Sequence, residues 1–310
     1  MPSNKYFKSF KLGWNRELSV NKLAFFLNLP SAFIILLVIA YPIVYAVYLS
    51  LHEITISGLR SGDTPFVGLK NYFTILTDPL FLSTLVRTIF MAIVSVSLMI
   101  SIGLFIALAM NCKKVWISYV TRTLVLLPWA IPPVANGLMW SFIYNSKFGH
   151  LNATLLGLGI IDDYVSILSD PTMAVTGVIW AYVWRVLPFE AILFYAALQT
   201  IPKDLYEAAT VDGASAWKQF CQITLPLLRP VLAVILILRT AFAIMIFDEV
   251  FALTHGGPGD STWTAAWYSY WTSFKLMEFD VGAASSFVLA VVIAIFTLLY
   301  IKFVYIKIEY

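Results

Sequence analysis

Charged side chains are scarce in this 310-residue sequence. Only 12% of the residues are Asp, Glu, Lys or Arg, whereas 60% are hydrophobic. A soluble domain usually carries about 25% charged residues, so the composition excludes an ordinary water-exposed surface. Long apolar stretches of this kind are typical of membrane-spanning helices. The net charge of +3 comes from scattered basic residues, so no basic patch indicates a nucleic-acid partner.

The residues of metal, disulfide and nucleotide sites are also missing. The two cysteines, Cys112 and Cys221, form no CxxC or Cys/His cluster, and His52, His150 and His255 lie far apart in the sequence. Metal sites need ligands at characteristic spacings, so we predict no bound metal and no disulfide. There is no GxxxxGK[ST] loop, so the chain has no ATP site of its own. We predict no catalytic residues, no enzyme activity and no cofactor in this chain.

Six apolar stretches are long enough for a membrane helix, which needs roughly 20 residues. They predict an all-α polytopic membrane protein with six transmembrane helices. The predicted spans are Leu29–Leu51, Leu85–Met110, Thr123–Tyr144, Met173–Leu198, Pro230–Leu253 and Val281–Tyr305. The first span is too long for a signal-peptide core and lacks a cleavage site. Pro42 and the set Pro128, Pro132 and Pro133 are predicted to kink spans one and three.

The basic residues orient these spans. With the N-terminus in the cytoplasm, thirteen Lys and Arg residues lie in inside segments and five in outside loops. The positive-inside rule therefore predicts cytoplasmic termini, with an N-terminal segment 1–28, a six-span domain 29–305 and a tail 306–310. The inside residues are Lys5, Lys8, Lys11, Arg16, Lys22, Lys113, Lys114, Arg122, Lys203, Lys218, Arg229, Lys302 and Lys307. The outside residues are Arg60, Lys70, Arg87, Lys147 and Lys275.

The predicted cytoplasmic loop 200–226, between spans four and five, has the pattern of two short helices. Pro202 suits a first helical turn, Gly213 suits the position after a helix, and Ser215 suits the N-cap of the next helix. One helical face carries four residues at i, i+3, i+4 and i+7, namely Leu205, Ala208, Ala209 and Asp212. The second helix is expected to pack on the membrane helices through Trp217, Phe220 and Cys221.

This loop carries a specific sequence pattern. Glu207-Ala208-Ala209 is followed by Gly213 and then by Ile223-x-Leu225-Pro226, which matches the EAA signature of ABC importer permeases at every position. Other resembling segments are Phe66–Tyr72 in the first outer loop, Leu198–Pro202 before the signature, and Phe247–Asp248 with Leu253–Pro258 at the end of span five. Over about residues 25–305 the chain resembles the sugar-type (maltose/glycerol-phosphate-like) permease subunits of binding-protein-dependent ABC importers.

The resemblance implies a function and its partners. An extracytoplasmic solute-binding protein delivers a sugar or sugar-like small molecule, and an ABC ATPase dimer, which binds ATP and magnesium, drives alternating access. A second permease subunit, expected to be a paralogue, completes the path in the lipid of a prokaryotic cell (inner) membrane. The coupling helices meet the ATPase through Glu207, Ala208, Ala209, Asp212, Gly213, Ile223, Leu225 and Pro226.

Two arginines, Arg185 and Arg239, are predicted near the centres of spans four and five. Charges at this depth are costly and usually face a cavity or a partner. The nearby acids Glu190, Asp248 and Glu249 are poorly placed for pairing along their own helices, so partners are expected from elsewhere. The arginines either line the transport path, meeting an anionic or heavily hydroxylated solute, or form structural ion pairs. The candidates for the path are Arg185, Arg239, Trp180, Trp184, Phe189, Glu190 and Asp248.

Two other classes of membrane protein stay open as alternatives. A secondary transporter driven by an ion gradient predicts two halves with matched broken helices, and no such pair is apparent in the sequence. An integral-membrane enzyme predicts His, Asp or Ser residues clustered at one membrane face, and no such cluster is found.

Overall fold

The computed structural model describes residues 20–111 and 115–304, and in these ranges the chain is almost entirely helical. The only β contact among them is an isolated antiparallel bridge between His52 and Phe66. The predicted all-α class is therefore confirmed. The chain divides into two compact units, residues 1–48 and 49–310, and each is described by itself. Residues 1–19, the segment 112–114 and the predicted tail 306–310 lie outside the described residues.

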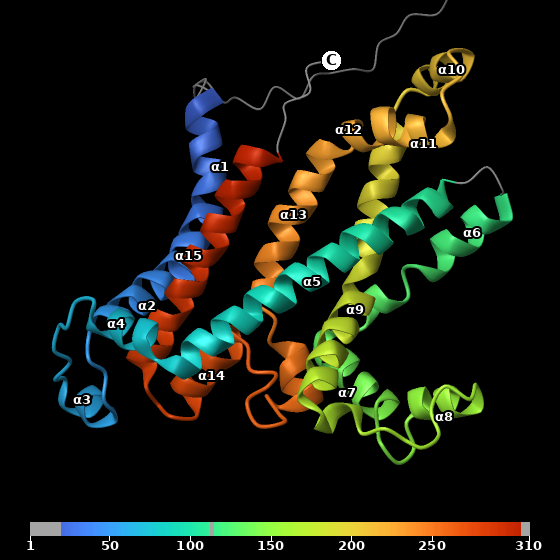
Figure 1. Cartoon of the computed structure of the whole chain (residues 1–310). Coiled ribbons are helices and arrows are strands. Elements are labelled where there is room, and N and C mark those ends of the chain that lie inside the picture. The colour runs from blue at the N-terminus through green and yellow to red at the C-terminus, as the bar shows by residue number, and fades with distance from the viewer. Residues whose placement is uncertain (1–19, 112–114, 305–310) are drawn as a thin grey trace, which may run out of the picture. The chain divides into compact units, whose positions relative to one another are not determined.

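The helices have the following bounds (Figure 1). Residues 20–61 form α1 Val20–Ile35, the π-helix η1 Leu36–Ala40, α2 Tyr41–Leu51 and α3 Ile56–Ser61. They are followed by α4 Lys70–Thr77, α5 Pro79–Met110, α6 Val115–Leu124, η2 Pro128–Ala130, α7 Pro133–Ile143, α8 His150–Gly157, η3 Ile167–Ser169 and α9 Pro171–Thr200. The last are α10 Lys203–Val211, α11 Ala216–Gln219, η4 Phe220–Thr224, α12 Leu225–Leu227, α13 Arg229–Ile244, η5 Val250–Thr254, α14 Ala265–Phe274 and α15 Phe279–Phe303.

Unit one contains a single apolar helix, in which α1, η1 and α2 follow one another without a break. It includes the predicted first span and begins nine residues earlier, at Val20. Pro42 does not end this helix. A proline lacks an N–H donor and crowds the carbonyl four residues earlier, which here belongs to Val38 in the π-helical turn. The wider π turn is the local adjustment that lets the helix continue through Pro42.

Two long helices, α5 and α9, pack along each other at the centre of unit two. Each begins at an aspartate cap: Asp78 accepts from the Leu80 N–H at 2.9 Å, and Asp170 accepts from the Met173 N–H at 2.8 Å. They approach closely at Gly103, where an added Cβ would lie 2.9 Å from the Cβ of Glu190. Small residues permit such contacts between membrane helices. The predicted spans two and four are thus helical, and both start a few residues earlier than predicted.

The predicted spans three and five are broken. The helices Ser118–Ala130 and Pro133–Ile143 meet at 101°, at the predicted proline set. Span five is predicted as one helix to Leu253, which is wrong: α13 ends at Ile244, and η5 begins only at Val250. Among the described residues, four helices are long and apolar enough to cross a membrane, or six if each bent pair counts as one span.

The connections of unit two are folded rather than extended. Asn71 on α4 donates to the carbonyls of Ser50 and His52, both at 3.0 Å, and so ties the first loop together. Asn152 on α8 exchanges two hydrogen bonds with the backbone of Val165, at 2.9 and 3.1 Å. In unit two the α10–α11 hairpin and the helices α8 and α14 lie at opposite ends (Figure 1). Two distinct surfaces are therefore available for partners.

Candidate functional site

Four charged side chains pair between α9 and the fifth span. From α9, Arg185 donates through Nε to Oε1 of Glu249 at 3.0 Å, with Nη2 of the same arginine at 2.9 Å from that oxygen. Arg239 on α13 forms the second ion pair, with Glu190 on α9. The expectation that each arginine finds its partner on another element is therefore confirmed. Glu249 was named as a nearby acid but was not among the candidates for the path.

Both pairs are buried, and aromatic rings flank the arginine of the second pair, Arg239. The side chain of Glu190 is 0% exposed and that of Glu249 is 2% exposed. The guanidinium carbon of Arg239 lies 4.6 Å from the ring centre of Phe189 and 6.0 Å from that of Phe242. An arginine above an aromatic face gains a cation–π attraction that grows as water is removed. The pairs thus keep four charges within an otherwise apolar bundle.

A cavity of about 390 Å³ opens beside the pairs. Three of the seven predicted path residues, Arg185, Arg239 and Asp248, line it together. Among the described residues, the carboxylate of Asp248 has no hydrogen-bond or ion-pair partner, and this side chain is half-buried. The other lining residues are Trp129, Pro133, Tyr182, Val186, Phe242, Met245, Ile246, Phe247 and Glu249. The cavity therefore combines aromatic walls with an unpartnered carboxylate.

The remaining predicted path residues do not line this cavity. Trp184 packs edge-on against Trp140 at 5.7 Å between ring centres, inside the hydrophobic core. Phe189 lies behind Arg239, Glu190 is fully enclosed, and Trp180 is outside the lining. The sequence analysis missed the aromatic residues Trp129, Tyr182 and Phe242. The proline set around Trp129 was the available signal, because a broken helix exposes side chains to a cavity.

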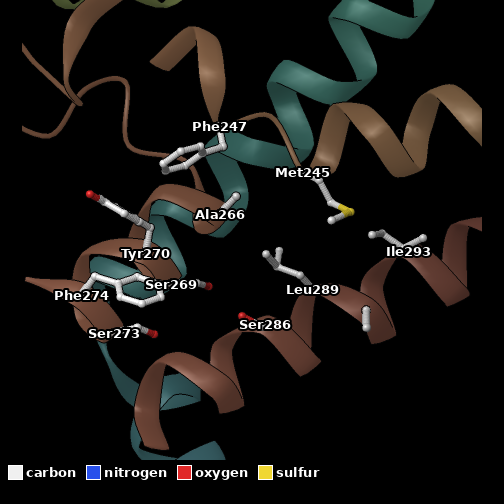
Figure 2. A pocket seen from close by; sticks show the side chains of 11 residues that line it. Met245, Phe247, Ala266, Ser269, Tyr270, Ser273, Phe274, Ser286, Leu289 and Ile293 are labelled. Carbon is white, nitrogen blue, oxygen red and sulfur yellow. The ribbon is translucent and has the colours of Figure 1, made fainter. Parts of the chain in front are cut away.

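A second cavity, of about 420 Å³, lies between α14, α15 and the end of α13 (Figure 2). Its serines are largely engaged with their own helices: Ser269 donates to the Ala265 carbonyl and Ser286 to the Gly282 carbonyl, both at 3.0 Å. Figure 2 shows the apolar side chains of Met245, Phe247, Leu289 and Ile293 around the remaining space. This cavity offers few free polar groups to a hydroxylated solute.

The segment 200–226 folds as the predicted helix pair. The first helix, α10, ends at Val211, and Gly213 follows with φ of +74°. Ser215 caps α11 by accepting from the Lys218 N–H at 3.3 Å. Tyr206 and Thr224 share a hydroxyl hydrogen bond of 2.8 Å, and the Gln219 amide donates to Thr210 at 3.1 Å. These bonds fix the two helices against each other, and Ile223 packs on the buried cluster around Phe194.

The outward face of this segment is accessible. Glu207, Ala208, Asp212 and Gly213 are exposed, and Leu225 is 40% exposed. Ala209, Ile223 and Pro226 are half-buried. The expectation that Trp217 packs on the membrane helices is wrong, because this side chain is 73% exposed and stacks on Phe220 at 5.5 Å. Val211 is 88% exposed. The segment therefore presents exposed apolar side chains together with the carboxylates of Glu207 and Asp212.

The sequence of the chain is similar to those of known membrane transport proteins. Residues 99–307 match the family model of the binding-protein-dependent transport system inner membrane component. The chain belongs to this family. It is 38% identical to the trehalose/maltose transport system permease protein MalF of Thermococcus litoralis, covering 91% of this chain and 93% of that protein. It is 33% identical to the sulfoquinovosyl glycerol transport system permease protein SmoG of Agrobacterium fabrum, covering 94% of both.

The fold is also similar to that of a solved ABC transporter structure. A crystal structure of a bacterial ABC transporter involved in the import of the acidic polysaccharide alginate matches with a TM-score of 0.77 at 24% identity. The match covers 90% of this chain and 94% of that chain. The predicted resemblance to an ABC importer permease is confirmed. Both the charged cavity and the 200–226 segment of this inner membrane component lie in the region 99–307 that the family model matches.

Gly213 offers a test of the turn in this inner membrane component. An added Cβ there meets nothing within 4 Å, so Gly213→Ala acts through the backbone at φ of +74° alone. A left-handed conformation costs a residue with a Cβ about 1–2 kcal/mol. We expect a lower thermal unfolding midpoint of the purified protein. Gly157→Ala at the end of α8 also has open space and no positive φ, so it serves as the control. Equal unfolding midpoints for the two variants would contradict the left-handed conformation of Gly213.

Proposed function

We propose that the chain is the permease subunit of an ATP-driven importer for a sugar or sugar-like solute. The observation that carries this proposal is the exposed helix pair of the 200–226 segment in a member of this transport family. The segment lies at the opposite end of unit two from α8 and α14 (Figure 1). An ATPase docked at one end and a solute-binding protein at the other are compatible with this geometry.

The coupling role falls on the exposed residues of α10 and the turn after it. We assign Glu207 to a basic side chain of the ATPase, Asp212 is a second exposed carboxylate after α10, and Ala208 permits close approach of a partner backbone. The half-buried Ile223 and Pro226 connect the hairpin to α13. ATP and magnesium are bound by the separate ATPase dimer, and its closure moves these helices. The chain itself has no catalytic role in this scheme.

The solute passes beside the two ion pairs. The cavity of about 390 Å³ is large enough for a small solute and carries both charged and aromatic groups. A relative is named as a trehalose/maltose permease protein, and this name supports a saccharide as the cargo. Aromatic faces such as that of Trp129 suit the apolar faces of sugar rings. The second permease subunit, expected to be a paralogue, closes the other side of the path.

The same proposal places the chain in a prokaryotic cell (inner) membrane with six crossings in contact with lipid. The bent pair Ser118–Ala130 with Pro133–Ile143 then forms one crossing, and Arg229–Ile244, which follows the cytoplasmic 200–226 segment after a bend of 61°, contributes to the fifth. Both termini lie in the cytoplasm, as the distribution of basic residues indicates. The division into 1–28, 29–305 and 306–310 follows from this topology.

Reconstitution tests the function directly. The chain is assembled in liposomes with a candidate second permease, ATPase and binding protein from the same organism, and uptake of labelled trehalose, maltose and lactose is measured. We expect uptake that requires ATP and the binding protein and that persists when ion gradients are dissipated. Uptake driven by an ion gradient without ATP would instead support the secondary-transporter alternative.

A further inference from the structure

Two arginines and two carboxylates line the cavity, and one of the carboxylates has no ion-pair partner. Arg185 faces Glu249 and Arg239 faces Glu190, so each cation has its own carboxylate. Asp248 lines the same cavity without a partner among the described residues. The lining residues from the bent third span, Trp129 in η2 and Pro133 at the start of α7, carry no charge. Among the charged residues that line the cavity, Asp248 is therefore the one without an ion-pair partner in the described chain, and it is an acid.

The unpaired carboxylate of Asp248 determines which solutes are electrostatically compatible with the cavity. An anionic group would approach the carboxylate of Asp248 while both arginines are already engaged by glutamates. Like charges at close range repel strongly where water is largely excluded. An ionised carboxylate only accepts hydrogen bonds, so it needs donors from the ligand. Sugar hydroxyl groups are such donors, and hydrogen bonds to a charged acceptor are stronger than neutral ones.

The walls of the cavity favour the same class of ligand. Trp129 is 54% exposed and Phe242 is 58% exposed, and both line the cavity. Their flat faces match the C–H faces of a sugar ring. Tyr182, whose hydroxyl has no hydrogen-bond partner among the described residues, adds a buried polar atom on α9. A solute that fits the cavity therefore has hydroxyl donors and apolar ring faces and carries no negative charge.

We propose that Asp248 binds hydroxyl groups of an uncharged, polyhydroxylated solute and that its charge discriminates against anionic solutes. This inference rests on the proposed function, and it decides between the anionic and the hydroxylated solutes that the arginines alone leave open. The arginines in this scheme position the cavity wall through their glutamate partners. Asp248 is the specificity-determining residue.

The test measures binding to the assembled permease–ATPase complex in nanodiscs. The neutral probes are maltose, trehalose and lactose, and the anionic probe is maltose with one C6 hydroxymethyl group oxidised to a carboxylate. For the wild type we expect a neutral probe to bind at least about tenfold more tightly than the anionic one. Asp248→Asn keeps the side-chain shape and leaves no ion pair broken. It should weaken the neutral probe about 10- to 100-fold and bring the two affinities within about threefold.

The control is Asp162→Asn, which removes an exposed carboxylate between α8 and η3, outside the cavity. It should leave both affinities unchanged. Tighter binding of the anionic probe to the wild type, unchanged affinities in Asp248→Asn, or no binding of any probe would each overturn the proposal. Uptake by the reconstituted importer distinguishes a failure of the role of Asp248 from a failure of the proposed function. If ATP-driven saccharide uptake persists while the Asp248 result fails, only the role of Asp248 is lost, whereas absent uptake overturns the proposed function itself.

Discussion

Replacing Glu207 with lysine is expected to abolish ATP-driven uptake while the permease subunits still assemble in the membrane. Glu207 is exposed on α10, so the substitution removes no internal hydrogen bond or ion pair among the described residues. At an interface with an ATPase it would place a cation where the proposed partner also carries one. Losing one member of a desolvated charge pair costs about 2–5 kcal/mol of binding, and a reversal costs at least as much. Uptake should fall to about a tenth of the wild-type rate or lower.

The measurement is copurification of the ATPase with the permease, together with solute-stimulated ATP hydrolysis. Glu207→Gln should give an intermediate loss, because it removes the attraction without adding repulsion. Glu53→Lys is the matched control. It makes the same charge change at an exposed glutamate, whose only ion pair in the described chain is with Lys70 on the first loop. Full ATPase binding by Glu207→Lys would mean that the coupling assignment is wrong.

Several helix ends of unit two carry chain-local signals, although the predicted spans two and four begin later than the helices, at Leu85 and Met173. Asp78 before Pro79 and Asp170 before Pro171 each combine a capping side chain with a residue suited to the first helical turn. The same holds for the 200–226 segment, where Gly213 and Ser215 end one helix and begin the next. These effects depend on neighbours along the chain, so a single sequence is enough to recognise them.

The break in the fifth span has no such local signal. The residues between α13 and η5, from Met245 to Glu249, include neither proline nor glycine, and the two acidic residues come only after three apolar ones. The interruption is stabilised from a distance, since Thr264 at the N-cap of α14 donates to the carbonyl of Ile246 at 2.9 Å. A backbone carbonyl released from a helix needs such a partner. Tertiary contacts therefore decide where α13 ends.

The ion pairs show the same limit. The sequence indicates that Arg185 and Arg239 need partners, because unpaired charges within a membrane are costly. It does not identify the partners, which lie on a different span in each case. The choice depends on how α9 packs against the fifth span and against α5, which approaches α9 closely where Gly103 meets Glu190. The pairing is thus a property of the three-dimensional structure.

Arg239→Gln is expected to destabilise the permease strongly. It leaves Glu190, with an exposed fraction of 0%, as an unpaired buried charge. Breaking a buried pair by removing one partner typically costs about 3–5 kcal/mol. The variant also loses the cation–π contact with Phe189. We expect a clearly lower thermal unfolding midpoint of the purified complex and reduced amounts of it in the membrane. Lys70→Gln is the control, because its pair with Glu53 is exposed and worth at most about 1 kcal/mol.

The double variant Arg239→Gln/Glu190→Gln separates the effect of the charge from that of shape. It removes both charges and keeps the side chains similar in size, so much of the lost stability should return. If transport also returns, the pair is a structural element of the cavity wall. If the double variant is stable but does not transport, Arg239 takes part in the path itself. A single variant Arg239→Gln as stable as the wild type would contradict the premise that pairing with Glu190 keeps this charge in the bundle.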